Sequence, residues 1–109
     1  MKTSITAKQL ADLGNVTIID VRKKPAYDEN PAVIADAQWR DPAAVDDWGA
    51  EFAGAALVVC YCVRDHEVSQ DASAALRARG LDARYLEGGI DGWKETGGAV
   101  EPKPNTKDQ

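Results

Sequence analysis

The stretch YCVRDHEVSQ, residues 61–70, gathers side chains that could do chemistry. It contains Cys62, Arg64, the only histidine of the chain, and the acids Asp65 and Glu67. An apolar run precedes it and a helix-like run follows it, so we expect the thiol at a strand end, beside loop amides and the positive end of a helix. Both features favour a thiolate, and the same N–H groups could hold an oxyanion while the sulfur attacks it. The pattern predicts a nucleophile at Cys62, against the alternative of an inert buried thiol.

The other polar side chains of this loop each have a structural and a functional interpretation. His66 could stabilise the thiolate or move a proton, or it could simply be solvated. Glu67 could hydrogen-bond the loop amides or act as an acid toward a leaving group, whereas we expect Asp65 to form a turn. Ser69 is expected to be the N-cap of the following helix, although its hydroxyl could also face the sulfur.

The composition limits the kinds of partner. The chain has 109 residues, enough for one domain with one core, and 18 acidic residues outnumber 13 basic ones. This balance gives no basis for binding nucleic acid or an anionic membrane surface. No apolar run approaches the roughly 20 residues that span a bilayer, and the start, MKTSITAKQL, lacks the apolar run of a secretory signal. We expect a cytoplasmic protein, present as a monomer or weak dimer.

The two cysteines are expected to be reduced. Cys60 and Cys62 would point to the same face of an extended strand, and a disulfide between residues two apart would be badly strained. Two free thiols agree with a reducing compartment. Cys60 lies inside the apolar run, so we expect it to be part of the core.

The strands of the fold are predicted from two buried runs and two shorter ones. Residues 15–21 and 55–62 are apolar without polar alternation, as in strands buried on both faces of a sheet. Residues 37–39 and 83–86 are shorter candidates. Between the first two of these runs, residues 23–35 are interpreted as a loop with a helical turn near residues 25–28, because they are mixed in character and contain two prolines.

The predicted helices have recognisable ends. Residues 4–14 place Thr6 and Gln9 at capping-box spacing and stop at Gly14. A second helix opens at Pro42, a third covers residues 68–80, and a last turn or helix covers residues 90–98. The remaining residues, 99–109, are polar and contain two prolines, so we interpret them as a disordered tail that follows a single domain of residues 1–98.

Strands that alternate with helices predict a mostly parallel sheet in a three-layer α/β domain. In such sheets, ligands bind beyond the carboxyl ends of the strands. Four polar segments should therefore meet at one edge of the sheet: residues 20–22, residues 39–41, the loop after Cys62, and residues 87–89. The candidate site lies where these segments converge.

Three motifs in this order resemble the rhodanese-like family: IIDVRKKPAY, VVCYCVRDHEVS and YLEGGIDGW. The resemblance covers about residues 4–98. It implies a sheet of about five mostly parallel strands with helices on both faces. It also implies a sulfurtransferase that needs no metal and no organic cofactor, and in which Cys62 takes sulfane sulfur from a small anion such as thiosulfate. The resulting persulfide would pass the sulfur to a thiophilic acceptor, either a small thiol or a protein.

The resemblance also assigns roles to individual residues. Asp20 and Arg22 are similar to the acidic and basic pair of the first motif, in which the arginine braces neighbouring loops beneath the active site. The loop that follows the catalytic cysteine Cys62 would bind the substrate, and its residues are Val63, Arg64, Asp65, His66, Glu67, Val68 and Ser69.

The loop departs from the common rhodanese pattern. If Ser69 is aligned with the family's serine, seven residues run from Cys62 to Val68, one more than usual and without a glycine. This length is similar to that of rhodanese-fold phosphatases and arsenate reductases, in which an arginine follows the cysteine after five residues. Val68 stands in place of that arginine, so the bidentate donor that a phosphate or arsenate dianion prefers is missing. We favour sulfur transfer. A phosphatase or arsenate reductase and a non-catalytic thiol-binding or protein-binding module are the alternatives.

Five further residues carry expectations. Arg40 could supply charge for a substrate. Gly88 and Gly89 would allow positive dihedral angles or a close approach of backbone to the loop. Trp48 and Trp93 are expected in the core or at its rim.

Overall fold

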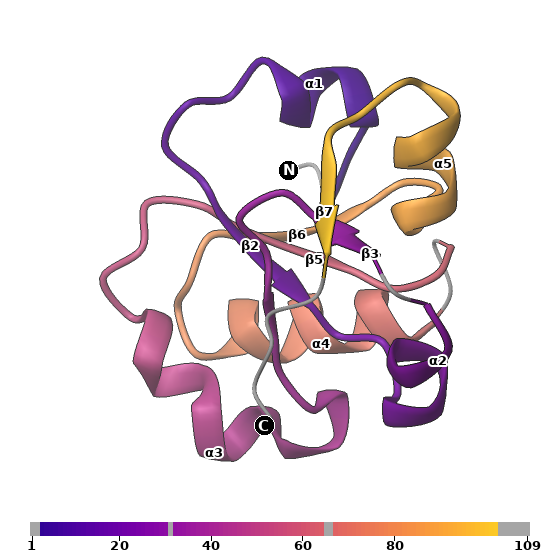
Figure 1. Ribbon diagram of the computed structural model, residues 1–109. Coiled ribbons are helices and arrows are strands. Elements are labelled where there is room, and N and C mark those ends of the chain that lie inside the picture. The colour runs from indigo at the N-terminus through magenta and orange to yellow at the C-terminus, as the bar shows by residue number, and fades with distance from the viewer. Residues whose placement is uncertain (1–2, 31, 65–66, 103–109) are drawn as a thin grey trace.

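The computed structural model describes residues 3–30, 32–64 and 67–102. A sheet of five strands forms its centre, and every neighbouring pair in this sheet is parallel. In spatial order the strands are β1 (Ser4–Ile5), β6 (Ala83–Leu86), β5 (Val58–Tyr61), β2 (Thr17–Asp20) and β4 (Gln38–Trp39). A separate antiparallel ribbon pairs β3 (Ala32–Ile34) with β7 (Val100–Pro102), as Figure 1 shows.

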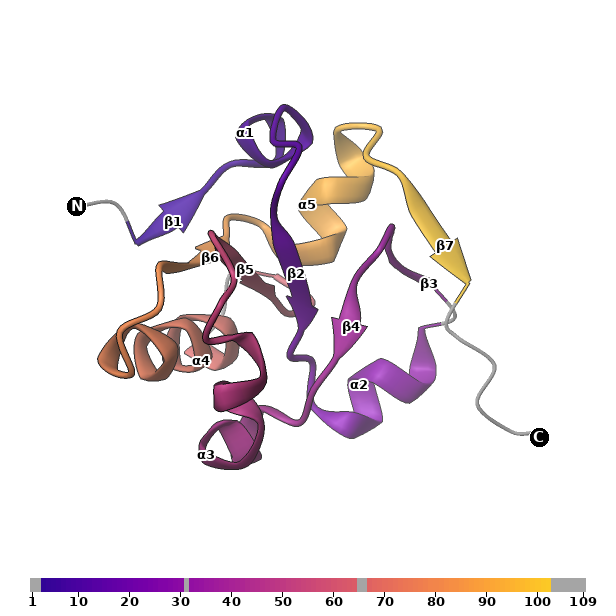
Figure 2. The same ribbon diagram turned by 90° about the vertical axis from the view of Figure 1, so that its left-hand side faces the viewer.

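Helices cover both faces of the sheet, which confirms the predicted three-layer α/β architecture (Figure 2). The α-helices are α1 (Ala7–Ala11), α2 (Lys24–Glu29), α3 (Val45–Trp48), α4 (Glu67–Ala78) and α5 (Gly89–Glu95). Two short 3-10 helices, η1 (Pro42–Ala44) and η2 (Gly49–Phe52), flank α3. Within the described ranges, no helix combines the length and apolarity needed to cross a bilayer.

The central strand β5 shows why the predicted buried runs lack polar alternation. Val59 and Tyr61 face the layer formed by α1, α5 and the β3–β7 ribbon, whereas Val58 and Cys60 face α3 and α4. All four side chains are fully buried. A strand that is covered on both faces has no position for a polar side chain unless that side chain finds a partner.

The first helix begins as its sequence predicts. The Thr6 hydroxyl accepts a hydrogen bond from the Gln9 amide at 3.1 Å, and the Gln9 side chain accepts one from the Thr6 amide at 3.0 Å. This reciprocal pair is the capping box expected from the spacing. Trp48 and Trp93 are both buried in the core, also as expected.

Two segments differ from the prediction. Residues 23–35 contain α2 and strand β3 rather than only a loop with a helical turn. Residues 100–102 form strand β7, where the sequence predicts the beginning of a disordered tail. The physical reason is the same for both strands: β3 and β7 stabilise each other across almost 70 positions of the chain, and neither carries a local signal of this pairing.

Trp93 anchors the segment that leads into β7. Its indole Nε1 donates to the Ala99 carbonyl at 2.8 Å, and the Ala35 amide donates to the same carbonyl at 3.1 Å. The backbone at Gly98 passes so close to the Trp93 ring that a Cβ atom there would collide with it. The absence of a side chain at this position lets the chain turn back toward β3.

We therefore expect Gly98→Ala to lower the free energy of unfolding by about 2 kcal/mol, because the added methyl group would displace the Trp93 ring. Amide hydrogen exchange of Ala35, whose amide donates to the Ala99 carbonyl beside Trp93, should become faster than in the wild type. Gly14→Ala is the matched control, since nothing lies within 4 Å of a Cβ atom there. Equal stability of the two variants in urea unfolding would contradict this prediction.

Candidate active site

The four polar segments meet at the carboxyl edge of the sheet, as predicted from the sequence. The Arg40 amide donates to the Asp20 carbonyl at 2.9 Å, and the Trp39 indole donates to the Arg22 carbonyl at 2.8 Å. On the other side, the Ile90 amide donates to the carbonyl of Cys62 at 3.0 Å. The candidate thiol thus follows β5 directly, with neighbouring segments attached on both sides.

The Cys62 thiol is buried, with 4% of the residue exposed, and faces the first turn of α4. Its Sγ lies 3.3 Å from the hydroxyl oxygen of Ser69 and donates a hydrogen bond to the carbonyl of Arg64. Ser69 is not the N-cap of the helix, which corrects one expectation, because α4 already begins at Glu67. The hydroxyl instead takes the second role considered for it and faces the sulfur.

Two consecutive glycines shape the loop after Cys62. Gly88 and Gly89 have φ angles of 79° and 59°, in the left-handed region, as the sequence suggested. A Cβ atom on Gly89 would lie 2.5 Å from the Cys62 carbonyl oxygen and 2.6 Å from the Arg64 amide nitrogen. The start of α5 can therefore press against the loop only if residue 89 is glycine.

The arginines at this edge are directed to acidic partners. Arg64, whose side chain is 54% exposed, has its Nε 3.5 Å from the Asp91 carboxylate on α5. Arg40, which could supply charge for a substrate, instead pairs its guanidinium with Glu51 at 2.8 Å. Glu51 lies on η2, and the sequence alone could not reveal this pairing.

Of the remaining residues of the predicted loop, the structure describes Val63, Glu67 and Val68. Val63 lies under α5, and its carbonyl accepts from the Asp91 amide at 3.1 Å. Glu67 is exposed in the first turn of α4, whereas Val68 packs against the apolar layer between α4 and the sheet. The roles predicted for Asp65 and His66 fall on positions outside the described residues.

Asp20 and Arg22 form a fully buried ion pair at the base of the site. Arg22 Nη2 lies 2.6 Å from Asp20 Oδ2 and also donates to the Ala32 carbonyl at 3.0 Å. The guanidinium lies over the rings of Tyr27 and Tyr61, at 5.3 and 5.9 Å from their centroids. Burial by itself would lower the pKa of Arg22, but the hydrogen bonds and charge of Asp20 outweigh it and raise that pKa. Through the charged Arg22 guanidinium, which also contacts the Ala32 carbonyl, the pair links β2 to β3.

Tyr61 is a site residue that sequence reasoning missed. It precedes Cys62, and its hydroxyl donates to Asp20 Oδ2 at 3.1 Å while it accepts from the Ile34 amide, also at 3.1 Å. Burial raises the pKa of this phenol far above its ordinary value, so it stays protonated. The available signal was a hydroxyl inside an otherwise apolar strand, since a buried tyrosine hydroxyl needs a partner.

Cys60 is a core residue, as predicted, and it is unsuited to act as a nucleophile. Both cysteines are free thiols, but Cys60 is fully buried and its burial raises the pKa of the thiol to about 12. A thiol must ionise to attack, so of the two cysteines only Cys62 remains a candidate nucleophile.

The Cys60 thiol should make stability depend on alkaline pH. In the unfolded chain it ionises near its ordinary pKa of ~8.5, whereas the native state keeps the proton. The unfolded state then binds fewer protons above this pH, so the free energy of unfolding falls as pH rises, by about 2 kcal/mol from this group at pH 10. Urea unfolding at pH 7 and pH 10 should show a larger drop in the wild type than in Cys60→Ala. Equal drops would contradict the prediction.

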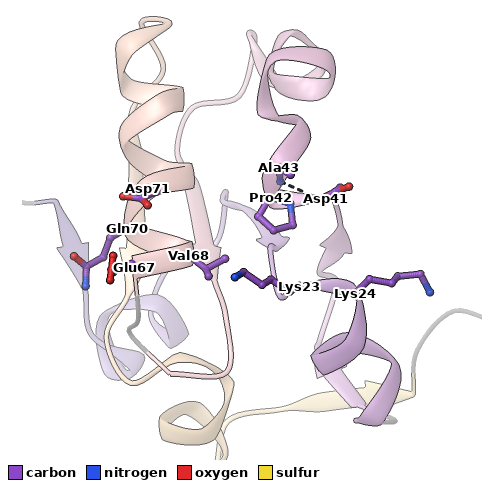
Figure 3. A pocket seen from close by; sticks show the side chains of 9 residues that line it. All are labelled: Lys23, Lys24, Asp41, Pro42, Ala43, Glu67, Val68, Gln70 and Asp71. Atoms are coloured by element: carbon purple, nitrogen blue, oxygen red, sulfur yellow. Dashed lines mark hydrogen bonds between the residues drawn. The ribbon is translucent and has the colours of Figure 1, made fainter.

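A groove of about 840 Å³ opens beside the thiol loop, between α4 and the start of α2 (Figure 3). Lys23, Lys24 and residues 41–43 form one wall. Glu67, Val68, Gln70 and Asp71 of α4 form the other. Ser69, which contacts the Cys62 sulfur, lies between two of these wall residues in the chain. The groove and the thiol therefore share the first turns of α4.

Comparisons with known proteins agree with this architecture. The family model described as a rhodanese-like domain matches residues 4–96. A rhodanese-like domain protein from Staphylococcus aureus is 27% identical, with 95% of this chain and 100% of that chain covered and a TM-score of 0.76. No curated protein matches the chain.

Two further solved structures share the fold at lower identity. A thiosulfate sulfurtransferase from Pseudomonas aeruginosa is 21% identical, with 94% of this chain but 20% of that chain covered and a TM-score of 0.78. A protein of unknown function from Rhodopseudomonas palustris, described as a "possible tyrosine phosphatase", is also 21% identical, with 92% and 85% covered and a TM-score of 0.78. The descriptions of these two proteins name different reactions, one of them only as possible, so the shared fold by itself does not select the reaction.

Proposed function

Because the chain belongs to the rhodanese-like domain family, we propose that it is a sulfurtransferase that carries sulfane sulfur as a persulfide on Cys62. One observation supports this most strongly. The Cys62 sulfur follows the central strand directly and faces the Ser69 hydroxyl at 3.3 Å in the first turn of α4. A hydroxyl and a helix N-terminus at this place favour negative charge on sulfur, whether in a thiolate or in a persulfide.

The reaction has two steps with Cys62 as the nucleophile. The thiolate attacks the outer sulfur of thiosulfate, a new S–S bond forms, and the S–S bond of the donor breaks with its electron pair leaving on sulfite. A thiolate or cyanide acceptor then attacks the outer sulfur of the persulfide and restores the Cys62 thiolate. Before the first step, the thiol proton must leave, and with it the hydrogen bond to the Arg64 carbonyl.

Phosphatase chemistry is the weaker candidate for this site. The position that would need a guanidinium is Val68, whose side chain packs against the apolar layer. Arg64 does not replace it, since its guanidinium lies beside Asp91. A phosphoryl dianion would lack the bidentate donor that usually holds it.

The partners follow from the proposed chemistry. The donor is a small sulfur-containing anion such as thiosulfate, and the acceptor is a thiol of a small molecule or a protein. A reducing cytoplasm is the compartment that suits both the two free thiols and a thiol acceptor.

Intact mass after brief exposure to thiosulfate tests the proposal. We expect the wild type and Cys60→Ala to gain one sulfur atom and Cys62→Ser to gain none. Absence of any gain, together with hydrolysis of phenyl phosphate, would assign the site to phosphatase chemistry. Absence of both would leave a non-catalytic binding module. A gain that persists in Cys62→Ser would exclude Cys62 as the carrier.

A further inference from the structure

The sulfur donor of the proposed reaction is a dianion, yet most cations near the thiol loop are already engaged. Arg22 is buried against Asp20, Arg40 pairs with Glu51, and Arg64 lies beside Asp91. Lys24 pairs with Asp28 at 2.7 Å on the surface of α2. An oxyanion that approaches Cys62 therefore needs a different cation.

Lys23 is the cation that the groove provides. It is exposed, and within the described part of the chain its ammonium group makes no hydrogen bond or ion pair. Figure 3 shows its side chain pointing across the groove toward Val68, whereas Lys24 points the other way. Val68 stands at the position where related phosphatases would carry their arginine. The Lys23 side chain therefore points toward the place where those enzymes would have a positive charge.

The acidic residues of the groove leave this place open to an anion. Asp41 caps η1, and its carboxylate accepts from the Ala43 amide at 2.9 Å. Figure 3 shows the side chains of Glu67 and Asp71 on the side of α4 that lies away from Lys23. The wall that carries Lys23 and Lys24 also contains Asp41, whose carboxylate is turned to the Ala43 amide, so Lys23 is the charged side chain that points across the groove.

We propose that Lys23 binds the oxyanion end of the sulfur donor in this groove, and so selects dianionic donors for Cys62. The inference rests on the proposed function. The first turn of α4 connects the groove with the Cys62 thiol, because Val68 lines the groove and the next residue, Ser69, contacts the Cys62 sulfur. The positive end of α4, a helix of 12 residues, adds to the attraction for an anion there.

Thiosulfate binding to the Cys62→Ser protein tests the role of Lys23 without sulfur transfer. Titration followed by amide chemical shifts should show saturable binding at Ala43, Val68 and Gln70. Adding Lys23→Met should weaken this binding about fivefold, as expected for a charge-assisted contact of an exposed side chain with a dianion. Lys23→Arg should largely restore the affinity. Lys24→Met, the matched control on the neighbouring residue, should leave the affinity within about twofold of the parent.

The outcomes separate this inference from the proposed function. If Lys23→Met and Lys24→Met have the same effect, or if thiosulfate does not bind saturably, the inference is wrong. It is also wrong if the wild type gains sulfur and Lys23→Met loads Cys62 at the same rate under subsaturating thiosulfate. If binding depends on Lys23 but the wild type never gains sulfur, the anion site stands and sulfur transfer is the claim that fails.

Discussion

Replacing Gly89 by alanine is expected to slow sulfur loading of Cys62 about 100-fold, the size of effect that follows from displacing a reacting group by about 1 Å. The added Cβ atom would lie 2.5 Å from the Cys62 carbonyl oxygen, so either the loop or the start of α5 must move. The φ angle of 59° adds roughly 1 kcal/mol of strain for any residue with a side chain. Both effects act on the peptide that carries the thiol.

The rate of mass gain under single-turnover conditions measures this effect on loading. Amide hydrogen exchange of Ile90 gives a second readout that does not depend on chemistry, because this amide donates to the Cys62 carbonyl. Gly92→Ala is the matched control in the same helix. Its Cβ atom would meet only the Glu87 carbonyl oxygen, at an ordinary 3.6 Å. Loading of Gly89→Ala at the rate of Gly92→Ala would contradict the prediction.

Replacing Arg22 by methionine should lower the free energy of unfolding by about 3–5 kcal/mol, because it leaves the Asp20 carboxylate buried without its counter-charge. Both side chains are fully buried, so water cannot replace the lost partner. The Ala32 carbonyl on β3 would lose its contact with the guanidinium as well. The change should loosen the attachment of β3 to the central sheet.

Urea unfolding of three variants checks this energetic role. The double variant Asp20→Leu with Arg22→Met should be more stable than Arg22→Met alone, since it removes the unpaired charge. Tyr61→Phe should cost only about 1–2 kcal/mol, as expected when a buried carboxylate and a backbone amide lose one hydrogen-bond partner. If Arg22→Met costs less than about 1 kcal/mol, the pair does not hold the base of the site in the way we describe.

The parts of the fold that were predicted are those with strong local signals. The capping box at Thr6 and the strand at residues 83–86 need only neighbours in the chain, and both appear as expected. The ribbon of β3 and β7 was missed because its stability arises from pairing between distant segments. The expected N-cap at Ser69 was wrong because α4 starts at Glu67, one residue before the predicted range of 68–80.

The sequence by itself determined the parallel α/β sheet, the family, and the edge at which the polar segments meet. These follow from the order of buried runs and helices and from three short motifs, which are local properties of the chain. Only the tertiary structure decided where the charged and hydroxyl groups of that edge point. It turns Arg64 toward Asp91, Arg40 toward Glu51 and Lys23 into the groove. It also brings the Tyr61 hydroxyl to the buried Asp20 carboxylate. A side chain's direction depends on partners from other elements, and the spacing of residues in the chain carries no record of those partners.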